Sequence, residues 1–143
     1  MAETGAQFEK RVTAYLEQTL STPLQKQYSV EIGGQLKRPH RFDLGNDGLL
    51  VECKAYKWGT TPDAALHNWD RAMYCFLLAG TSFQKYFVVK KSYNAEHSKT
   101  LLEYYLEHRG NFVPNDARIL ELDEQNTARE FRYDESAEPF VAA

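Results

Sequence analysis

The spacing of apolar residues changes along the chain, and each change predicts a different element. Over residues 4–20 the apolar side chains recur at helical spacing and define one buried stripe. Thr4 with Gln7 matches a capping box at the start of this helix. Residues 25–32 alternate with period two instead, as a strand does when one face is covered. The helical stripe consists of Phe8, Val12, Tyr15, Leu16 and Leu20.

A β-hairpin is predicted next. Residues 40–44 alternate polar and apolar positions, and residues 49–56 are predicted to be the returning strand. Asp47-Gly48 lies between them, and this dipeptide favours a two-residue type I′ turn. Such a turn sets the register of the two strands.

This register is expected to bring charged side chains together. If the two turn residues form the loop, Asn46 pairs with Leu49, and Asp43 lies directly opposite Glu52. Directly opposite residues share a face, with Cβ atoms roughly 4.5–5.5 Å apart. Lys54 shares the face of Glu52 because it is two residues further along the strand. The hairpin therefore predicts two carboxylates and an amine on one face of a sheet.

Two more helices follow along the chain. The first begins with Thr61 as N-cap and Pro62 at its first position. A continuous apolar run at residues 86–89 predicts a central strand covered on both faces. A further helix is predicted over residues 98–108. The apolar face of the first helix carries Leu66, Trp69, Met73, Phe76 and Leu77, and that of the second carries Leu101, Leu102, Tyr105 and Leu106.

A last short strand over residues 118–122 completes the order helix, strand, strand, strand, helix, strand, helix, strand. This order predicts the α/β class, as a single three-layer αβα domain with a mixed central β-sheet. The domain is predicted over residues 1–123, and residues 124–143 are predicted to form an acidic C-terminal extension.

The composition is that of a globular chain with one core. Its 143 residues are 43% hydrophobic and 26% charged, which suits a single domain. No apolar run approaches the ~20 residues that span a bilayer, and the N-terminus has no signal pattern, so we expect a cytoplasmic protein with no membrane partner. Cys53 and Cys75 lack metal-ligand spacing and are expected to be reduced, buried thiols.

The carboxylate pair predicts a metal site. Asp43 and Glu52 repel each other at this separation unless a cation lies between them. Oxygen ligands favour Mg²⁺, with Mn²⁺ as a substitute, over zinc. Lys54 could then orient or deprotonate a water, which points to hydrolysis of a phosphodiester. Glu9, at the edge of the helical stripe, either points toward this site or faces solvent. The alternative for the hairpin residues is a cross-strand salt-bridge patch on a solvated sheet face.

The charges are unevenly distributed along the chain. A net charge of −3 argues against a nucleic-acid partner, but residues 116–143 carry eight acidic residues and three arginines, so the rest of the chain is positive. Arg38, Arg41 and Lys57 are predicted to form a basic rim around the carboxylates that suits a phosphate backbone. Tyr56 adds a ring that could stack on a base. The alternative is an ordinary mixed surface.

These residues resemble the motifs of the PD-(D/E)xK nuclease superfamily. Asp43 matches the first acidic position, and Glu52-Cys53-Lys54 matches the (D/E)-x-K. Gly5 with Phe8-Glu9 resembles the Gly-x-x-Phe-Glu in the first helix of several members. Phe42 stands where the motif name has a proline. The resemblance covers roughly residues 4–123, by the order of elements more than by identity.

The resemblance implies a restriction-endonuclease-like fold and a Mg²⁺-dependent enzyme that cleaves DNA, duplex or branched, as an endonuclease. It implies that Asp43, Glu52 and the backbone carbonyl of Cys53 hold the metal, that Glu9 faces the same site, and that Lys54 positions the attacking water. It also implies a homodimer, or a partner protein that supplies DNA contacts. Two other functions stay open, a Holliday-junction resolvase and a non-catalytic nucleic-acid-binding or assembly module on the same fold.

Overall fold

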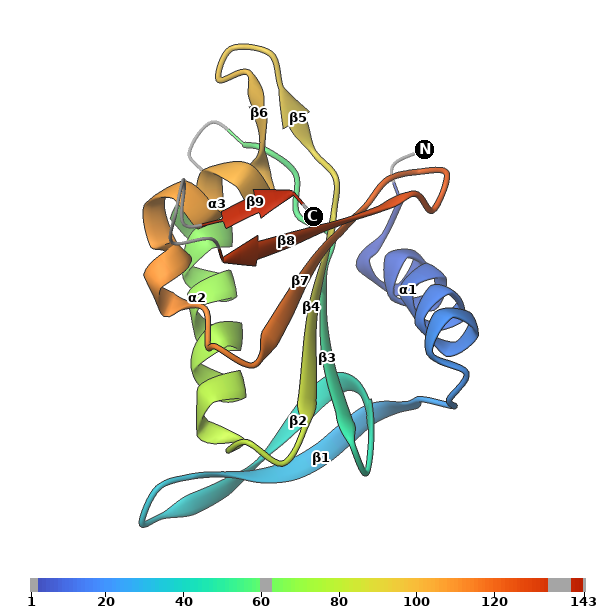
Figure 1. Ribbon diagram of the computed structural model, residues 1–143, viewed down its shortest axis with the longest axis vertical. Coiled ribbons are helices and arrows are strands. Elements are labelled where there is room, and N and C mark those ends of the chain that lie inside the picture. Colours follow the sequence, from blue (N-terminus) through green and yellow to red (C-terminus); the bar gives the residue numbers. More distant parts are fainter. Residues whose placement is uncertain (1–2, 60–62, 134–139, 143) are drawn as a thin grey trace.

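The computed structural model describes residues 3–59, 63–133 and 140–142 of the chain (Figure 1). Its helices are α1 (Gly5–Leu20), α2 (Asp63–Leu78), α3 (Leu101–Arg109) and the short 3₁₀ helix η1 (Gly110–Phe112). Its strands are β1 (Gln25–Gly33), β2 (Lys37–Asn46), β3 (Leu49–Lys54), β4 (Gln84–Lys90), β5 (Tyr93–Asn94), β6 (Lys99–Thr100), β7 (Ala117–Leu122), β8 (Ala128–Tyr133) and β9 (Phe140–Ala142).

Within the described residues, seven strands form one mixed sheet in the order β1-β2-β3-β4-β7-β8-β9. The pairs β3–β4 and β4–β7 are parallel, and the remaining pairs are antiparallel. The chain runs through α2 between β3 and β4, and through α3 between β4 and β7. The predicted α/β class with a mixed central sheet is confirmed. The strands β5 and β6 form a separate two-stranded hairpin.

Helices cover both faces of the sheet (Figure 1). α1 lies on one face, and its buried residues and the sheet residues beneath it form the α1 core. α2 and α3 lie on the other face, above the α2/α3 core. The α1 core contains Phe8, Val12, Leu16, Leu44, Leu49, Val51, Tyr86, Val88, Leu120 and Leu122. The α2/α3 core includes Phe42, Leu50, Trp69, Phe76, Phe87, Val89, Tyr105, Ile119 and Phe131. In the part of the chain that the structure describes, no helix has the length and apolar character to cross a membrane.

Capping residues define where two of the helices begin. At α1 the predicted capping box is confirmed, since Thr4 Oγ1 accepts from the Gln7 N–H at 3.1 Å and Gln7 Oε1 accepts from the Thr4 N–H at 2.8 Å. α3 begins later than predicted, because a second capping box of Thr100 and Glu103 begins it. The predicted N-cap Thr61 and the following Pro62 lie outside the described residues.

One predicted core position in α2 is wrong. Leu77 is 61% exposed. The buried stripe of α2 runs through Trp69, Ala72 and Phe76, and Leu77 lies past its edge in the last turn of the helix. The other predicted face residues of α2 are buried.

The chain beyond residue 123 belongs in part to the sheet, although the sequence predicts an acidic extension over residues 124–143. β8 pairs with β7, and β9 pairs with β8. Phe131 of β8 is only 6% exposed and packs in the α2/α3 core. The described residues before and after position 123 therefore share one sheet.

Candidate functional site

The β2–β3 hairpin has the predicted register, since Asn46 pairs with Leu49. The predicted type I′ turn is wrong, because neither Asp47 nor Gly48 has the positive φ that this turn requires. The Gly48 N–H instead donates to Asn46 Oδ1 at 2.9 Å. The backbone ladder ends two pairs further on, before it reaches Asp43. Beyond the ladder, a side chain replaces the backbone as acceptor: Asp43 Oδ2 accepts a hydrogen bond from the Cys53 N–H at 2.8 Å. The carboxylate of Asp43 thus binds the backbone near the end of β3. Its partner, Cys53, directly follows Glu52 in the chain.

β2 changes its orientation at Asp43. The β1–β2 ladder forms the pairs on either side of Gln27 and Asp43 but skips that pair itself. Gln27 has a φ of 52°, in the left-handed region that most side chains avoid. Phe42 packs in the α2/α3 core whereas Leu44 packs in the α1 core, so the strand rotates between them. Irregularities of this kind re-aim a side chain out of the regular pleat, and here that side chain is Asp43.

Glu52 is the centre of a charged group on the α2 side of the sheet. It is buried, with 5% of the residue exposed. Lys54 Nζ lies 3.7 Å from Glu52 Oε2, and His40 Nε2 lies 3.4 Å from Glu52 Oε1. The His40 ring packs edge-on against Phe42, and its Nδ1 lies 3.8 Å from Cys75 Sγ. Both oxygens of the buried carboxylate are therefore next to a nitrogen group.

The second carboxyl group, Asp43, has an unusual electrostatic environment. Burial raises the pKa of Asp43 to about 7, and the negative charge of Glu52 adds to this effect. The hydrogen bond from Cys53 and the charge of Lys54 act in the opposite direction but do not outweigh them. Near neutral pH, Asp43 is therefore divided between its protonated and charged forms.

Glu9 of α1 lies within electrostatic range of the two hairpin carboxyl groups. Burial raises the pKa of Glu9, Lys26 acts against this, and the charge of Glu52 adds to it. The charge of Glu9 in turn contributes to the raised pKa of Asp43. Thr13 Oγ1 donates to the backbone carbonyl of Glu9 at 2.7 Å, so this contact leaves the Glu9 carboxylate unengaged.

The donor groups at this site suit a small oxygen-bound cation. Among the described residues, no group of three or more His, Cys, Asp and Glu side chains is arranged to hold a metal ion. Glu9 is therefore near Asp43 and Glu52 in electrostatic terms but does not form a three-residue group with them. Mg²⁺ is commonly held by one or two carboxylates, with water and phosphate oxygens completing its shell. The pair fits this mode, and a cation would offset both the burial that raises the pKa of Asp43 and the smaller contribution of the negative charge of Glu52.

The residues predicted to contact nucleic acid do not form one continuous rim. Arg38, Arg41 and Lys57 are exposed, and Tyr56 is 42% exposed. Arg38 lies near the tip of the β1–β2 hairpin, five residues from Asp43, which corresponds to roughly 16 Å along a strand. Lys57 lies just after β3, five residues beyond Glu52.

The contact between His40 and Glu52 was not predicted from the sequence. The signal was present in the spacing, because His40 is two residues before the apolar Phe42 and so shares its face. That face packs against α2, where Phe42 stacks with Phe76 at a centroid distance of 5.7 Å. Cys53, by contrast, packs against the α1 core but is only half-buried, whereas Cys75 is buried as predicted, and both cysteines are free thiols.

Comparisons with family models, with curated proteins and with solved structures find no match to this chain.

Proposed function

We propose that this protein is a metal-dependent nuclease that hydrolyses phosphodiester bonds in DNA as an endonuclease, on a restriction-endonuclease-like version of the α/β fold. The observation that carries the proposal is the pair of carboxyl groups at the break in β2. Asp43 and Glu52 come from adjacent strands, Glu52 is buried and Asp43 half-buried, and the charge of Glu52 adds to the cost that burial imposes on ionising Asp43. A cation bound between them would offset this cost.

The proposed metal is Mg²⁺, with Mn²⁺ as a substitute. Asp43, Glu52 and the backbone carbonyl of Cys53 would hold it, and Glu9 would act on it from α1 at longer range. A divalent cation bound here lowers the pKa of a water molecule and offsets the charge that builds on a phosphate. Both carboxylates would then bind in their charged forms, so the affinity should rise with pH through the pKa of Asp43, about 7.

Lys54 and His40 would complete the site. Lys54 is 15% exposed at its side chain, and its ammonium group is held 3.7 Å from Glu52. This position keeps a proton donor and a positive charge beside the carboxylate pair, where it can orient the attacking water and stabilise the phosphate. His40 holds the other oxygen of Glu52 and thereby orients the carboxylate.

A second function, a non-catalytic nucleic-acid-binding or assembly module, draws on one specific observation. Both oxygens of Glu52 already face nitrogen groups of His40 and Lys54, so this carboxylate is balanced without any bound cation. In this alternative Arg38, Arg41 and Tyr56 bind nucleic acid, and the charged group only shapes the sheet face.

Cleavage assays with matched variants separate these functions. The protein would be incubated in Mg²⁺ or Mn²⁺ with linear, single-stranded, flapped and four-way-junction DNA. Lys54→Gln and Asp43→Asn remove the proposed catalytic charges, while Lys10→Gln and Asp47→Asn make the same changes at exposed positions. We expect the first two variants to lose at least about 100-fold in rate and the controls to keep it.

The preferred substrate distinguishes a Holliday-junction resolvase from a general endonuclease. Cleavage confined to the four-way junction would identify a Holliday-junction resolvase, and cleavage of linear duplex would identify a general endonuclease. Binding to every DNA without cleavage would overturn the nuclease in favour of the non-catalytic module. Measuring the mass of the active species in solution decides whether it acts as a homodimer or needs a partner protein for its DNA contacts.

A further inference from the structure

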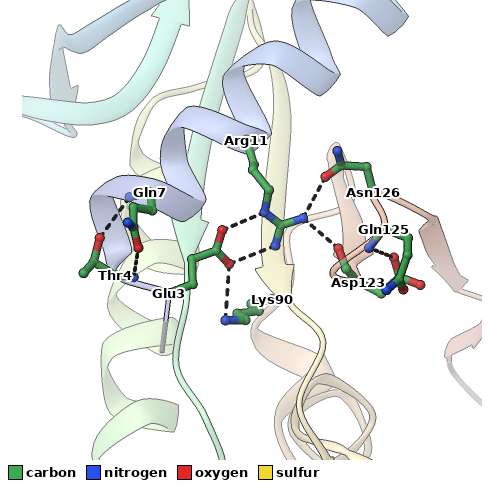
Figure 2. A network of polar contacts seen from close by, with 8 residues as sticks. All are labelled: Glu3, Thr4, Gln7, Arg11, Lys90, Asp123, Gln125 and Asn126. Atoms are coloured by element: carbon green, nitrogen blue, oxygen red, sulfur yellow. Dashed lines mark hydrogen bonds and ion pairs between the residues drawn. The ribbon is translucent and has the colours of Figure 1, made fainter. Parts of the chain in front are cut away.

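A second charged feature lies where the N-terminus meets the ends of β4 and β7. It is a cavity of about 630 Å³ whose charged walls are Glu3, Arg11, Lys57, Lys90, Lys91 and Glu124. Glu3 directly precedes Thr4, the N-cap of α1. Figure 2 shows its carboxylate between the side chains of Arg11 and Lys90. Neither Asp43 nor Glu52 lines this cavity.

Arg11 is held rigidly in the cavity wall. Its Nη1 donates to the backbone carbonyl of Asp123 and to Asn126 Oδ1, both at 2.7 Å (Figure 2). The turn that carries these acceptors is itself fixed, because the Gln125 and Thr127 N–H groups donate to Asp123 Oδ1 at 2.9 Å. The two remaining donors of Arg11, Nε and Nη2, therefore point along one fixed direction.

Those two donors bind the carboxylate of Glu3. Arg11 Nε lies 2.7 Å from Glu3 Oε2, and Arg11 Nη2 lies 2.9 Å from Glu3 Oε1. Lys90, which is 8% exposed, adds its Nζ at 3.2 Å from Glu3 Oε1. The hydrogen bond from Arg11 lowers the pKa of Glu3, so Glu3 is charged at neutral pH. An arginine fork with an adjacent lysine is also an arrangement that binds phosphate oxygens.

The cavity has more positive charge than Glu3 can balance. Four cationic side chains line it against the two carboxylates of Glu3 and Glu124. Within the described residues, Lys57 and Lys91 are exposed and form no ion pair. A terminal phosphate carries more charge and more acceptor oxygens than a carboxylate, so it could engage these lysines as well as the arginine fork. An internal phosphodiester carries one charge, as a carboxylate does, and could engage the same groups with its two free oxygens.

The position of the cavity relates it to the candidate nuclease site. Lys57 follows Lys54 by three residues, and Lys90 follows Val89, the residue that pairs with Lys54 across β3 and β4. Both sites therefore lie at the carboxyl ends of the same two parallel strands. A nucleic-acid strand that passes over this end of the sheet could contact the carboxylate pair on the α2 side and place another of its phosphates in the cavity on the α1 side.

We propose that this cavity binds a phosphate group of the nucleic-acid substrate, and that Glu3 occupies it as an internal substitute until the phosphate displaces it. The proposal rests on the proposed function for the identity of its ligand. It differs from a purely structural role of Glu3, in which the carboxylate only ties the N-terminus to the sheet.

The test is binding of labelled, short single-stranded DNA, measured by fluorescence anisotropy in EDTA so that no cleavage occurs. The probes carry a 5′-phosphate, a 3′-phosphate or neither. Glu3→Gln removes the competing charge and should tighten binding about two- to fivefold. The double variant Lys57→Gln/Lys91→Gln should weaken binding by a similar factor and reduce the salt slope by roughly 1.4.

The controls are Glu31→Gln and Lys10→Gln, which change exposed charges outside the cavity and should leave binding unchanged. A preference for one terminal phosphate that the lysine variant abolishes identifies a terminal-phosphate site. Equal weakening with all probes identifies an internal phosphate. If Glu3→Gln lowers the melting temperature, the lysine variant decides, because its side chains are exposed and hold no ion pair among the described residues.

Two results would overturn the inference: binding that the lysine variant leaves unchanged, or binding that Glu3→Gln weakens in a folded protein. The inference and the proposed function fail separately. DNA cleavage that depends on Lys54 but not on the cavity residues removes only the phosphate cavity. Binding that responds to the cavity variants, in a protein that cleaves no DNA, supports the cavity and removes the nuclease.

Discussion

Replacing Asp43 with asparagine should stabilise the metal-free protein at alkaline pH. Asparagine can keep the structural contact, because its Oδ1 can accept from the Cys53 N–H, as the carboxylate does at 2.8 Å. The substitution removes the charge, and with it the cost of ionising a buried group beside Glu52. It therefore separates the electrostatic effect of Asp43 from its role in holding β3.

The size of this effect follows from the raised pKa. The pKa of Asp43 is about 7 in the folded protein, against an ordinary value of 3.8. As the pH rises through about 4, the unfolded chain releases this proton while the folded protein keeps it, so the free energy of unfolding falls. The fall is complete above the folded pKa. A difference of about 3 pKa units corresponds to about 4 kcal/mol.

Urea unfolding in EDTA measures this free energy for the wild type, Asp43→Asn and the control Asp47→Asn. Asp47 is an exposed carboxylate on the same hairpin, and it accepts a hydrogen bond from Tyr28 at 3.1 Å that asparagine can also accept. Asp43→Asn should match the wild type near pH 4 and exceed it by up to about 4 kcal/mol near pH 8.5. Asp47→Asn should show no such change with pH.

Mg²⁺ gives the complementary measurement. It should raise the stability of the wild type at alkaline pH and leave Asp43→Asn nearly unchanged, because the cation binds only the folded carboxylate pair. A stability difference between Asp43→Asn and the wild type that is the same at both pH values would refute the reasoning. Such a constant difference would come from a lost hydrogen bond or a cavity at position 43, because the effect of either on stability does not depend on the ionisation of Asp43.

Three further substitutions test other parts of the structure by the same unfolding measurement. Gln27→Gly should stabilise the protein by about 1 kcal/mol, since glycine adopts the φ of 52° without strain; destabilisation would contradict the strained conformation. Tyr105→Phe should cost about 1–2 kcal/mol, because it removes the hydrogen bond that the buried hydroxyl donates to Asp70 at 3.0 Å; no loss would show that the bond adds nothing to stability. Phe131→Ala should cost about 3–5 kcal/mol while Phe112→Ala, at a 50% exposed position, costs far less; equal small effects would mean that β8 adds little to the core.

The parts of the fold that the sequence predicts well depend on local chemistry. The capping box at Thr4 and the pairing of Asn46 with Leu49 each involve residues close together in the chain, and both are present. The two-residue loop length was enough to predict the register and the approach of Asp43 to β3, although the predicted type I′ conformation of the turn is wrong. Core positions of α1 and α3 were predictable because each helix buries a single stripe.

The parts that escaped prediction depend on contacts between distant segments. The acidic composition after residue 123 concealed β8, because its charges are paired across strands. Arg118 of β7 binds Glu130 of β8 at 2.7 Å, and Arg129 of β8 binds the buried Glu121 of β7 at 2.8 Å. A count of charges along the chain cannot show this pairing.

The contact between His40 and Glu52 escaped prediction for a related reason. Regular alternation would place Phe42 and Leu44 on one face of β2, whereas the break at Asp43 sends them into different cores. The break involves Gln27 of β1, which has no sequence signal for a left-handed conformation. The geometry of the site therefore depends on a neighbouring strand that the motif itself does not include.

The contacts of Arg11 have a consequence for the order in which the chain folds. The two carboxyl groups of the candidate site lie on the arms of one hairpin, which can form within microseconds once its turn is made. The Arg11 contact with Asp123 joins residues 112 positions apart. Contacts at such separation form late, because the loop between them must first be ordered. We therefore expect the like charges of the hairpin to come together before the N-terminal helix is joined to the end of β7, and we expect the Arg11 contacts to slow unfolding more than they speed folding.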